Sequence, residues 1–361
     1  MDPPSSLGSS EANASAQSLY THVDPASQRP DSSTSCSSVL ESHPFEQIDP
    51  DTYFTSNPPP PHLVEHERQL AAFIAHHQAP TPTQPQRTTT TSPRKVVLVT
   101  SGGTIVPLEN NTVRFIDNFS AGTRGSASAE FFLVRGYAVI FLYRERSLQP
   151  FARHFGQAKG SVLDYLVPGA EPGQPPRVKP EYAAEMATQL ARYQEAIASN
   201  SLLMITFTTL TDYLFHLRAA AKALSVLGPR AMYYLAAAVS DFFIPAQRMV
   251  EHKIQSADGG LTLTMDQVPK FLRPLLETDP NLLISKAKFA LMRYGHQVVI
   301  GNLLTTRKRT VTVITKTDQF DITLTDAELT RNPPAEIEEL IVARLDALHD
   351  AFIAESSAAQ A

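Results

Sequence analysis

The stretch of residues 96–146, VVLVTSGGTIVPLENNTVRFIDNFSAGTRGSASAEFFLVRGYAVIFLYRER, decides the fold of this chain. It opens with an apolar run, residues 96–100, that leads directly into Ser-Gly-Gly-Thr. A short β-branched run of this kind predicts a buried parallel strand whose carboxyl end opens into a ligand loop. A second glycine-containing loop, residues 118–125, precedes a helical pattern that lasts to Arg135, and residues 137–142 form the next apolar run.

Strand, glycine loop, helix and strand in this order predict a doubly wound α/β fold, in which anions bind backbone N–H groups at a helix N-terminus. The dinucleotide motif G-x-G-x-x-G does not follow the first strand, and no P-loop motif occurs around Gly102. The residues alone therefore indicate an anion or nucleotide site. For either loop taken singly, glycines that merely turn the chain are an equally good explanation, whereas two such loops together favour a ligand.

The composition divides the 361 residues into parts. Residues 1–44 are rich in Ser, Ala, Asp and Pro, and residues 79–94 are rich in Pro and Thr, so we expect a disordered tail and a disordered linker. Between them lies an extension, residues 45–78, in which residues 63–77 have the apolar spacing of a helix that docks on the domain. We expect the main domain at residues 95–350 and a second disordered tail at residues 351–361.

Charge and cysteine content limit the partners that we expect. The formal net charge of −5 and the pI near 6.1 give no reason to expect nucleic acid or an anionic membrane. The longest apolar runs, such as residues 232–239, are too short to span a bilayer. The single cysteine, Cys36, lies in the predicted tail and implies neither a disulfide nor a thiol nucleophile. We therefore expect a cytoplasmic protein.

One short pattern could suggest a metal. His62-x-x-Glu65-His66 is formally the inverted zinc-hydrolase motif. It stands beside a proline run and within the predicted helix of the extension, so we interpret it as a solvated helix face. We expect no metal site built from protein ligands.

Later segments add two charged candidates. The predicted strand at residues 231–235 ends in three alanines and then Asp241, which either contacts a ligand or caps a turn. Lys253 either neutralises phosphate groups or is a solvated loop charge. We find no nucleophile elbow and no cysteine in the domain. This inventory suits a reaction without a protein nucleophile, such as activation of a carboxylate by a nucleotide.

Seven motifs resemble the eukaryotic phosphopantothenate–cysteine ligase family, also called phosphopantothenoylcysteine synthetase, and most of all its fungal members. They occur in order from the first strand almost to the closing helix: VTSGGTIVPLE at 99–109, VRFIDNFSAGTRG at 113–125, FTTLTDYL at 207–214, YLAAAVSDFF at 234–243, EHKIQS at 251–256, VPKFL at 268–272 and HQVVIGNLL at 296–304.

The resemblance implies a Rossmann-like doubly wound parallel sheet with helices on both faces and a small dimerisation lobe. It implies a homodimer that joins 4′-phosphopantothenate to L-cysteine through an acyl-adenylate on the way to coenzyme A. The cosubstrate would be ATP, or CTP as in bacterial relatives, and Mg²⁺ would arrive with the nucleotide.

The resemblance also implies roles for individual residues. Asn118, reaching across the dimer to bind the acyl-phosphate intermediate, and Lys253, neutralising phosphates, would be catalytic. The nucleotide would be bound by Gly102, Ser120, Gly122, Gly125 and Asn302. The substrate arm would be held by Ala237, Ala238 and Asp241.

The chain departs from the family in one place. After Leu275 the family has a tryptophan-containing link and an apolar strand, about a dozen residues that are absent here. The loss of an internal strand predicts an unstable or poorly active protein, unless a neighbouring segment fills the gap. The alternative function is therefore a catalytically impaired ligase-fold subunit that acts as a binding partner. A nicotinamide-dependent oxidoreductase is a remoter alternative, because its glycine motif is missing.

Overall fold

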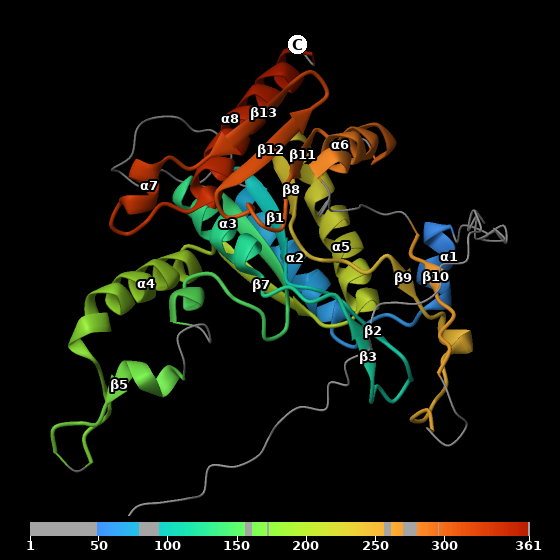
Figure 1. The fold of residues 1–361 in the computed structure, drawn as a ribbon, viewed down its shortest axis with the longest axis horizontal. Helices are drawn as coiled ribbons and strands as arrows, with labels where there is room; N and C mark the ends of the chain where they lie inside the picture. The colour runs from blue at the N-terminus through green and yellow to red at the C-terminus, as the bar shows by residue number, and fades with distance from the viewer. Residues whose placement is uncertain are drawn as a thin grey trace, which may run out of the picture. The chain divides into compact units, whose positions relative to one another are not determined.

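The computed structural model describes residues 49–78, 94–155, 161–171, 173–255, 261–269, 280–294 and 296–359. Four parallel strands form its central sheet in the order β7-β4-β1-β8 (Figure 1). Their bounds are β1 Val96–Ser101, β4 Ala138–Arg144, β7 Leu202–Phe207 and β8 Ala231–Leu235. Every residue of β1 is buried, as expected for a central strand covered on both faces. The predicted α/β class and its parallel sheet are thereby confirmed.

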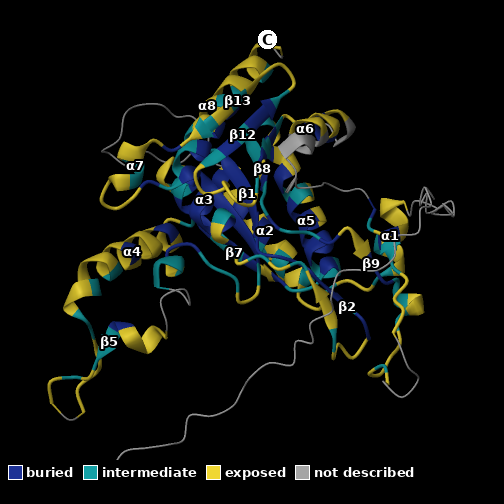
Figure 2. Cartoon of the chain, viewed as in Figure 1, coloured by how far each residue is buried: buried dark blue, intermediate teal, exposed yellow. Residues whose placement is uncertain are grey.

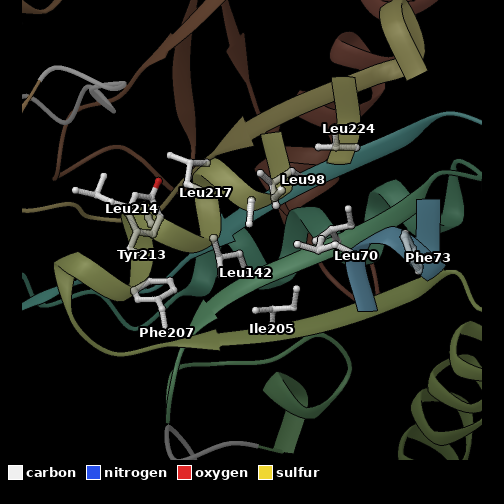
Figure 3. Packing of buried hydrophobic residues seen from close by; sticks show 14 of the residues in the cluster. Leu70, Phe73, Leu98, Leu142, Ile205, Phe207, Tyr213, Leu214, Leu217 and Leu224 are labelled. Carbon is white, nitrogen blue, oxygen red and sulfur yellow. The ribbon is translucent and has the colours of Figure 1, made fainter. Parts of the chain in front are cut away.

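Alternate residues of β1 enter two hydrophobic cores, because successive side chains of a strand point to opposite faces. Val97 and Val99 pack with α3 (Thr123–Val134) and α8 (Ile337–Ala358). Leu98 packs on the other face with residues of α2 (Leu63–Gln78) and α5 (Leu210–Leu224), as Figure 3 shows. Figure 2 shows that buried residues concentrate in this sheet and its covering helices.

The N-terminal extension is part of this fold. Helix α1 (Pro50–Ser56) precedes α2, whose bounds match the predicted helix to within one residue. Leu70 and Phe73 of α2 are buried in the core that α5 also lines (Figure 3). The predicted tail at residues 1–44 lies outside the described residues, as does all but residue 94 of the predicted linker at 79–94.

Smaller elements surround the central sheet. Two-stranded pairs are formed by β2 (Ile105–Pro107) with β3 (Phe115–Asp117), by β5 (Leu166–Val167) with β6 (Arg177–Val178), and by β9 (Phe242–Phe243) with β10 (Asp266–Gln267). Helix α4 (Pro180–Ala198) leads into β7, and α7 (Asp326–Thr330) precedes α8. Short 3₁₀ turns lie at Ala152–Phe155, Val162–Tyr165, Ser225–Arg230 and Ala246–Arg248.

A second, antiparallel sheet follows helix α6 (Pro280–Tyr294). It contains β11 (Val298–Gly301), β12 (Thr310–Thr315) and β13 (Gln319–Thr323) in that order. Within the described ranges, β8 pairs only with β1, and β11 pairs only with β12. Among the described residues, β8 and β11 therefore belong to separate sheets, and the predicted position of the missing strand lies between them in the chain. Residues 270–279, which include Leu275, lie outside the described residues.

One boundary differs from the prediction. Helix α8 runs to Ala358, so residues 351–358 are helical and the predicted disordered tail at 351–361 is wrong for them. Apolar periodicity weakens there, but alanine and glutamate have high helix propensity and continue the helix. In the described part of the chain, no helix combines the length and apolar character that crossing a bilayer requires.

Candidate active site

The loops that leave β1 and β8 meet at the carboxyl edge of the sheet. The backbone continues the parallel pairing past the strand ends: the Ala238 N–H donates to the Gly102 carbonyl oxygen at 2.7 Å, and the Thr104 N–H donates to the Ala238 carbonyl oxygen at 3.0 Å. Thr100 and Thr104 accept the N–H groups of Ala237 and Ser240 through their hydroxyl oxygens. The structure therefore brings together Gly102, Ala237 and Ala238, three predicted site residues.

These hydrogen bonds limit which backbone groups of Ala237 and Ala238 can bind a ligand. Both amides donate within the protein, Ala237 to Thr100 Oγ1 at 3.2 Å and Ala238 to Gly102 O. A backbone contact with a substrate would therefore use carbonyl oxygens rather than N–H groups. The small methyl side chains would let the substrate approach closely.

Gly103 fixes the position of Asn118. A Cβ atom at residue 103 would lie 1.7 Å from the Asn118 carbonyl oxygen, so only glycine allows the two backbones to approach this closely. The Asn118 N–H donates to the Thr104 carbonyl oxygen at 3.1 Å. Gly103 was not among the predicted site residues, although the consecutive glycines after the strand were a signal for it.

The second glycine loop joins β3 to α3. Gly122 is the N-cap of α3 with φ of +79°, and its carbonyl oxygen accepts the Ser101 hydroxyl at 3.1 Å. No side chain caps the first turn of α3, so no side-chain acceptor occupies the N–H groups at its start. The Gly122 N–H lies 3.4 Å from the Ser120 hydroxyl oxygen. Gly125 is buried, and a Cβ there would lie 2.5 Å from the Ser101 Cβ, which shows a packing role besides any phosphate contact.

Arg124, a residue that the sequence analysis missed, connects this loop to Asn302. Its Nη2 donates to the Arg307 carbonyl oxygen at 2.8 Å and lies 3.4 Å from Asn302 Oδ1. Its Nη1 lies 3.3 Å from Glu338 Oε1, and burial raises the pKa of Glu338 while the guanidinium opposes that rise. Asn302 is thereby placed beside the start of α3. In the sequence, the role of Arg124 was indicated only by the presence of a basic residue between Gly122 and Gly125.

Lys253 belongs to a segment that is tied to the β2–β3 hairpin. The buried Glu109 carboxylate accepts the N–H groups of Arg114 and Ile254 and forms an ion pair with the Arg114 guanidinium. Burial alone would raise the pKa of Glu109, but these hydrogen bonds and the guanidinium hold it below its usual value. Arg114 Nη2 also donates to the Ile254 carbonyl oxygen. The segment that carries Lys253 is therefore attached to the hairpin that precedes Asn118.

Lys253 and Asp241 are both exposed. Within the described residues, the Lys253 ammonium group forms no ion pair, so its charge is available to an anion. The Asp241 carbonyl oxygen accepts the Val268 N–H at 2.9 Å. This hydrogen bond attaches the segment after Ala238 to the chain just after β10. Within the described ranges, no hydrogen bond or ion pair connects Lys253 to the glycine loops. Nor do those ranges contain a group of three His, Cys, Asp or Glu side chains that could hold a metal ion.

Comparisons with known proteins agree with one another. A family model described as the C-terminal domain of DNA/pantothenate metabolism flavoprotein matches residues 93–155. The chain is 47% identical to the Homo sapiens phosphopantothenate–cysteine ligase over 275 residues, 72% of this chain and 88% of the relative. It is 39% identical to the Saccharomyces cerevisiae phosphopantothenate–cysteine ligase CAB2 over 339 residues, 84% of this chain and 87% of the relative.

A solved structure is also similar. It contains a histidine-to-alanine variant of Cab2 in complex with phosphopantothenate-cysteine. It superposes with a TM-score of 0.74 at 40% identity and covers 85% of this chain and 99% of that chain. The similarity therefore extends from the sequence to the arrangement of the elements.

Proposed function

We propose that this chain, which belongs to the phosphopantothenate–cysteine ligase family, joins 4′-phosphopantothenate to L-cysteine in coenzyme A biosynthesis. One observation carries the proposal for its site: Gly103, Asn118 and Ala238 meet at the carboxyl edge of the sheet. In open α/β sheets this edge is where ligands bind. The relatives named above are all ligases, so they give no support to the alternative of an impaired binding subunit.

The reaction has two steps and needs no protein nucleophile. In the first step, a carboxylate oxygen of 4′-phosphopantothenate attacks the α-phosphorus of a nucleoside triphosphate, and the bond to pyrophosphate breaks. In the second step, the cysteine amine attacks the acyl carbon, loses a proton and forms the amide, while the nucleoside monophosphate leaves. The protein contributes by orienting the reactants and neutralising charge.

We assign roles on this basis. Gly102, Ser120, Gly122, Gly125 and Asn302 would hold the nucleotide, and the uncapped start of α3 supports this assignment. Ala237, Ala238 and Asp241 would hold the pantothenate arm. Lys253 would neutralise phosphate charge, which its exposed ammonium group suits. ATP is the expected nucleotide, with CTP as the alternative, and Mg²⁺ would arrive bound to the phosphates.

Asn118 would bind the intermediate, in the site of a partner subunit. Exposed apolar side chains surround it: Phe119 is 83% exposed and Phe115 is 47% exposed. Large apolar side chains exposed together, here one on β3 and one just after it, are typical of an interaction surface. We therefore propose a homodimer in which this surface contacts the second copy.

Pyrophosphate release from the full chain tests the reaction. With ATP, we expect release that requires 4′-phosphopantothenate, and amide formation only when cysteine is added. Parallel reactions with CTP determine the nucleotide. Release that is independent of 4′-phosphopantothenate, or none with either nucleotide, would contradict the proposal. The cytoplasm is the expected compartment and the nucleus is the alternative, which imaging of a fluorescent fusion would separate.

A further inference from the structure

Helix α1 of the N-terminal extension lies against the segment that follows Asp241. Asp49 caps the helix by accepting the N–H groups of Asp51 and Thr52, and Pro50 occupies its first turn. These features fix a helix of only seven residues, too short to be stable without tertiary contacts. The stabilising contact comes from Tyr53, the only buried residue of α1.

Tyr53 contacts two elements of the candidate site at once. Its ring packs edge-on against Phe243 of β9, with the ring centroids 5.1 Å apart. Its hydroxyl lies 3.0 Å from Thr211 Oγ1 in the first turn of α5. The side chain is only 1% exposed, and burial raises the pKa of Tyr53 to about 12, so the phenol is protonated and can donate at neutral pH.

Both contacted elements hold the proposed substrate segment. Phe243 stands two residues after Asp241 and pairs with Asp266 across the β9–β10 ladder. The start of α5 is preceded by Thr208, whose carbonyl oxygen accepts the Ile105 N–H just beyond the Gly103–Ala238 contact. The residues that contact α1 around a cavity of about 80 Å³ include Phe243, Pro245 and Gln247. Figure 1 shows α1 beside β9 and β10.

The nucleotide residues, in contrast, have other supports. Gly102 and Gly122 pack against Ser147 and Ser101, and Asn302 lies beside Arg124. The described hydrogen bonds and ring contacts of Tyr53 reach none of these residues.

We propose that Tyr53 is a positioning residue for 4′-phosphopantothenate: through Phe243 and Thr211 it sets the conformation of the Ala237–Asp241 segment. The N-terminal extension is then part of the substrate site rather than an appendage. This inference rests on the proposed role of Asp241. It predicts an effect on one substrate and not on the other two.

Steady-state kinetics of the full chain with Tyr53→Phe test the proposal. Loss of the Tyr53–Thr211 hydrogen bond should raise the KM for 4′-phosphopantothenate by about fivefold, and leave the KM values for nucleotide and cysteine within about twofold. Thr211→Val should reproduce the effect, and the double variant should add nothing further, because both changes remove the same bond.

Tyr137→Phe is the matched control. Tyr137 is also buried and its hydroxyl lies 2.9 Å from His349 Nδ1, on the face of the sheet covered by α8. We expect this variant to lower the thermal midpoint without changing any KM. If Tyr53→Phe behaves in the same way, or changes all three KM values together, the positioning role is wrong.

Asp241→Asn separates this failure from failure of the assigned site. If Asp241→Asn raises the KM for 4′-phosphopantothenate and Tyr53→Phe does not, only the positioning role is wrong. If neither variant changes that KM, the assignment of the substrate arm to this segment is also wrong.

Discussion

At the scale of single residues, Gly103 has the most direct effect on the proposed catalytic geometry. Gly103→Ala would place a methyl group 1.7 Å from the Asn118 carbonyl oxygen, so the Asn118 backbone must move. Because a displacement of about 1 Å at a reacting group can cost about 100-fold in rate, we expect kcat to fall by about that factor. Initial rates of pyrophosphate release measure the loss.

Gly136→Ala is the control for this change. Gly136 has φ of +84°, but a Cβ there would meet no atom within 4 Å. The variant should therefore lose about 1 kcal/mol of stability through backbone strain and keep its kcat. Equal kcat values for the two alanine variants would show that the position of Asn118 does not depend on Gly103.

The residues that the sequence identified and those that it missed differ in the range of their contacts. Glycines after a strand, an aspartate after small residues and a lysine in a motif are local signals, and the structure places several of them at one sheet edge. Arg124 reaches Asn302, which is 178 residues further along the chain. That contact depends on how α3 and the second sheet meet, and no local pattern encodes it.

At the scale of elements, the docking of α2 should depend on pH. His77 Nε2 lies 2.8 Å from the Asn200 carbonyl oxygen at the entry to β7, and burial lowers the pKa of His77 from 6.5 to about 4. Between these two values the unfolded chain binds the proton and the folded chain does not. The contribution of His77 to the free energy of unfolding is therefore fully present above pH 6.5. It falls as the pH drops toward 4, by at most about 3 kcal/mol.

His77→Gln should remove this contribution, because glutamine can donate to the same carbonyl group without titrating. The free energy of unfolding, measured by circular dichroism in urea at pH 7 and pH 5, should then fall less with acidification than in the unaltered chain. His76→Gln, which removes an exposed imidazole from the same turn, is the matched control. An unchanged pH dependence in His77→Gln would contradict the assignment.

The edge of β8 that faces away from β1, which has no partner strand among the described residues, gives a second prediction at this scale. The Ala236 N–H donates to the Thr100 carbonyl oxygen of β1, so the amides of Tyr234 and Met232 face β1 as well. The intervening amides of Tyr233 and Leu235 point away from β1, toward the side of β8 that has no partner strand among the described residues. Native-state hydrogen exchange should therefore be fast at Tyr233 and Leu235 and slow at Tyr234. Strong protection at all three would mean that another segment completes the sheet.

The elements themselves were largely predictable because their patterns are strong. The four parallel strands are apolar runs, and β1, β4 and β8 lie where the runs at 96–100, 137–142 and 231–235 predict them. The end of α8 was mistaken because the prediction followed apolar periodicity, whereas helix propensity carries residues 351–358. The register of the parallel sheet could not be predicted, because its strands pair with partners far apart in the sequence, as Val96 does with Ala231.

At the scale of the whole molecule, the proposed site requires two copies of the chain if Asn118 acts across a dimer. Two impaired variants, assayed at a 4′-phosphopantothenate concentration at which neither turns over, then rescue each other: one subunit with Asn118→Ala and one with Asp241→Asn. In a mixed dimer, one site combines an intact Asp241 with the partner's intact Asn118, and the other site has neither. After equal amounts are refolded together, half of the dimers are mixed, so about a quarter of all sites should be active.

The outcome distinguishes the two arrangements without a structure of the dimer. If Asn118 serves the site of its own subunit, every site in every dimer lacks one of the two residues, and mixing restores nothing. Phe119→Asp, which places a charge in the exposed apolar surface beside Asn118, should give a monomer by sedimentation velocity and abolish the rescue. Rescue that persists in a monomeric Phe119→Asp background would contradict the shared site, because no partner subunit is then present to supply Asn118.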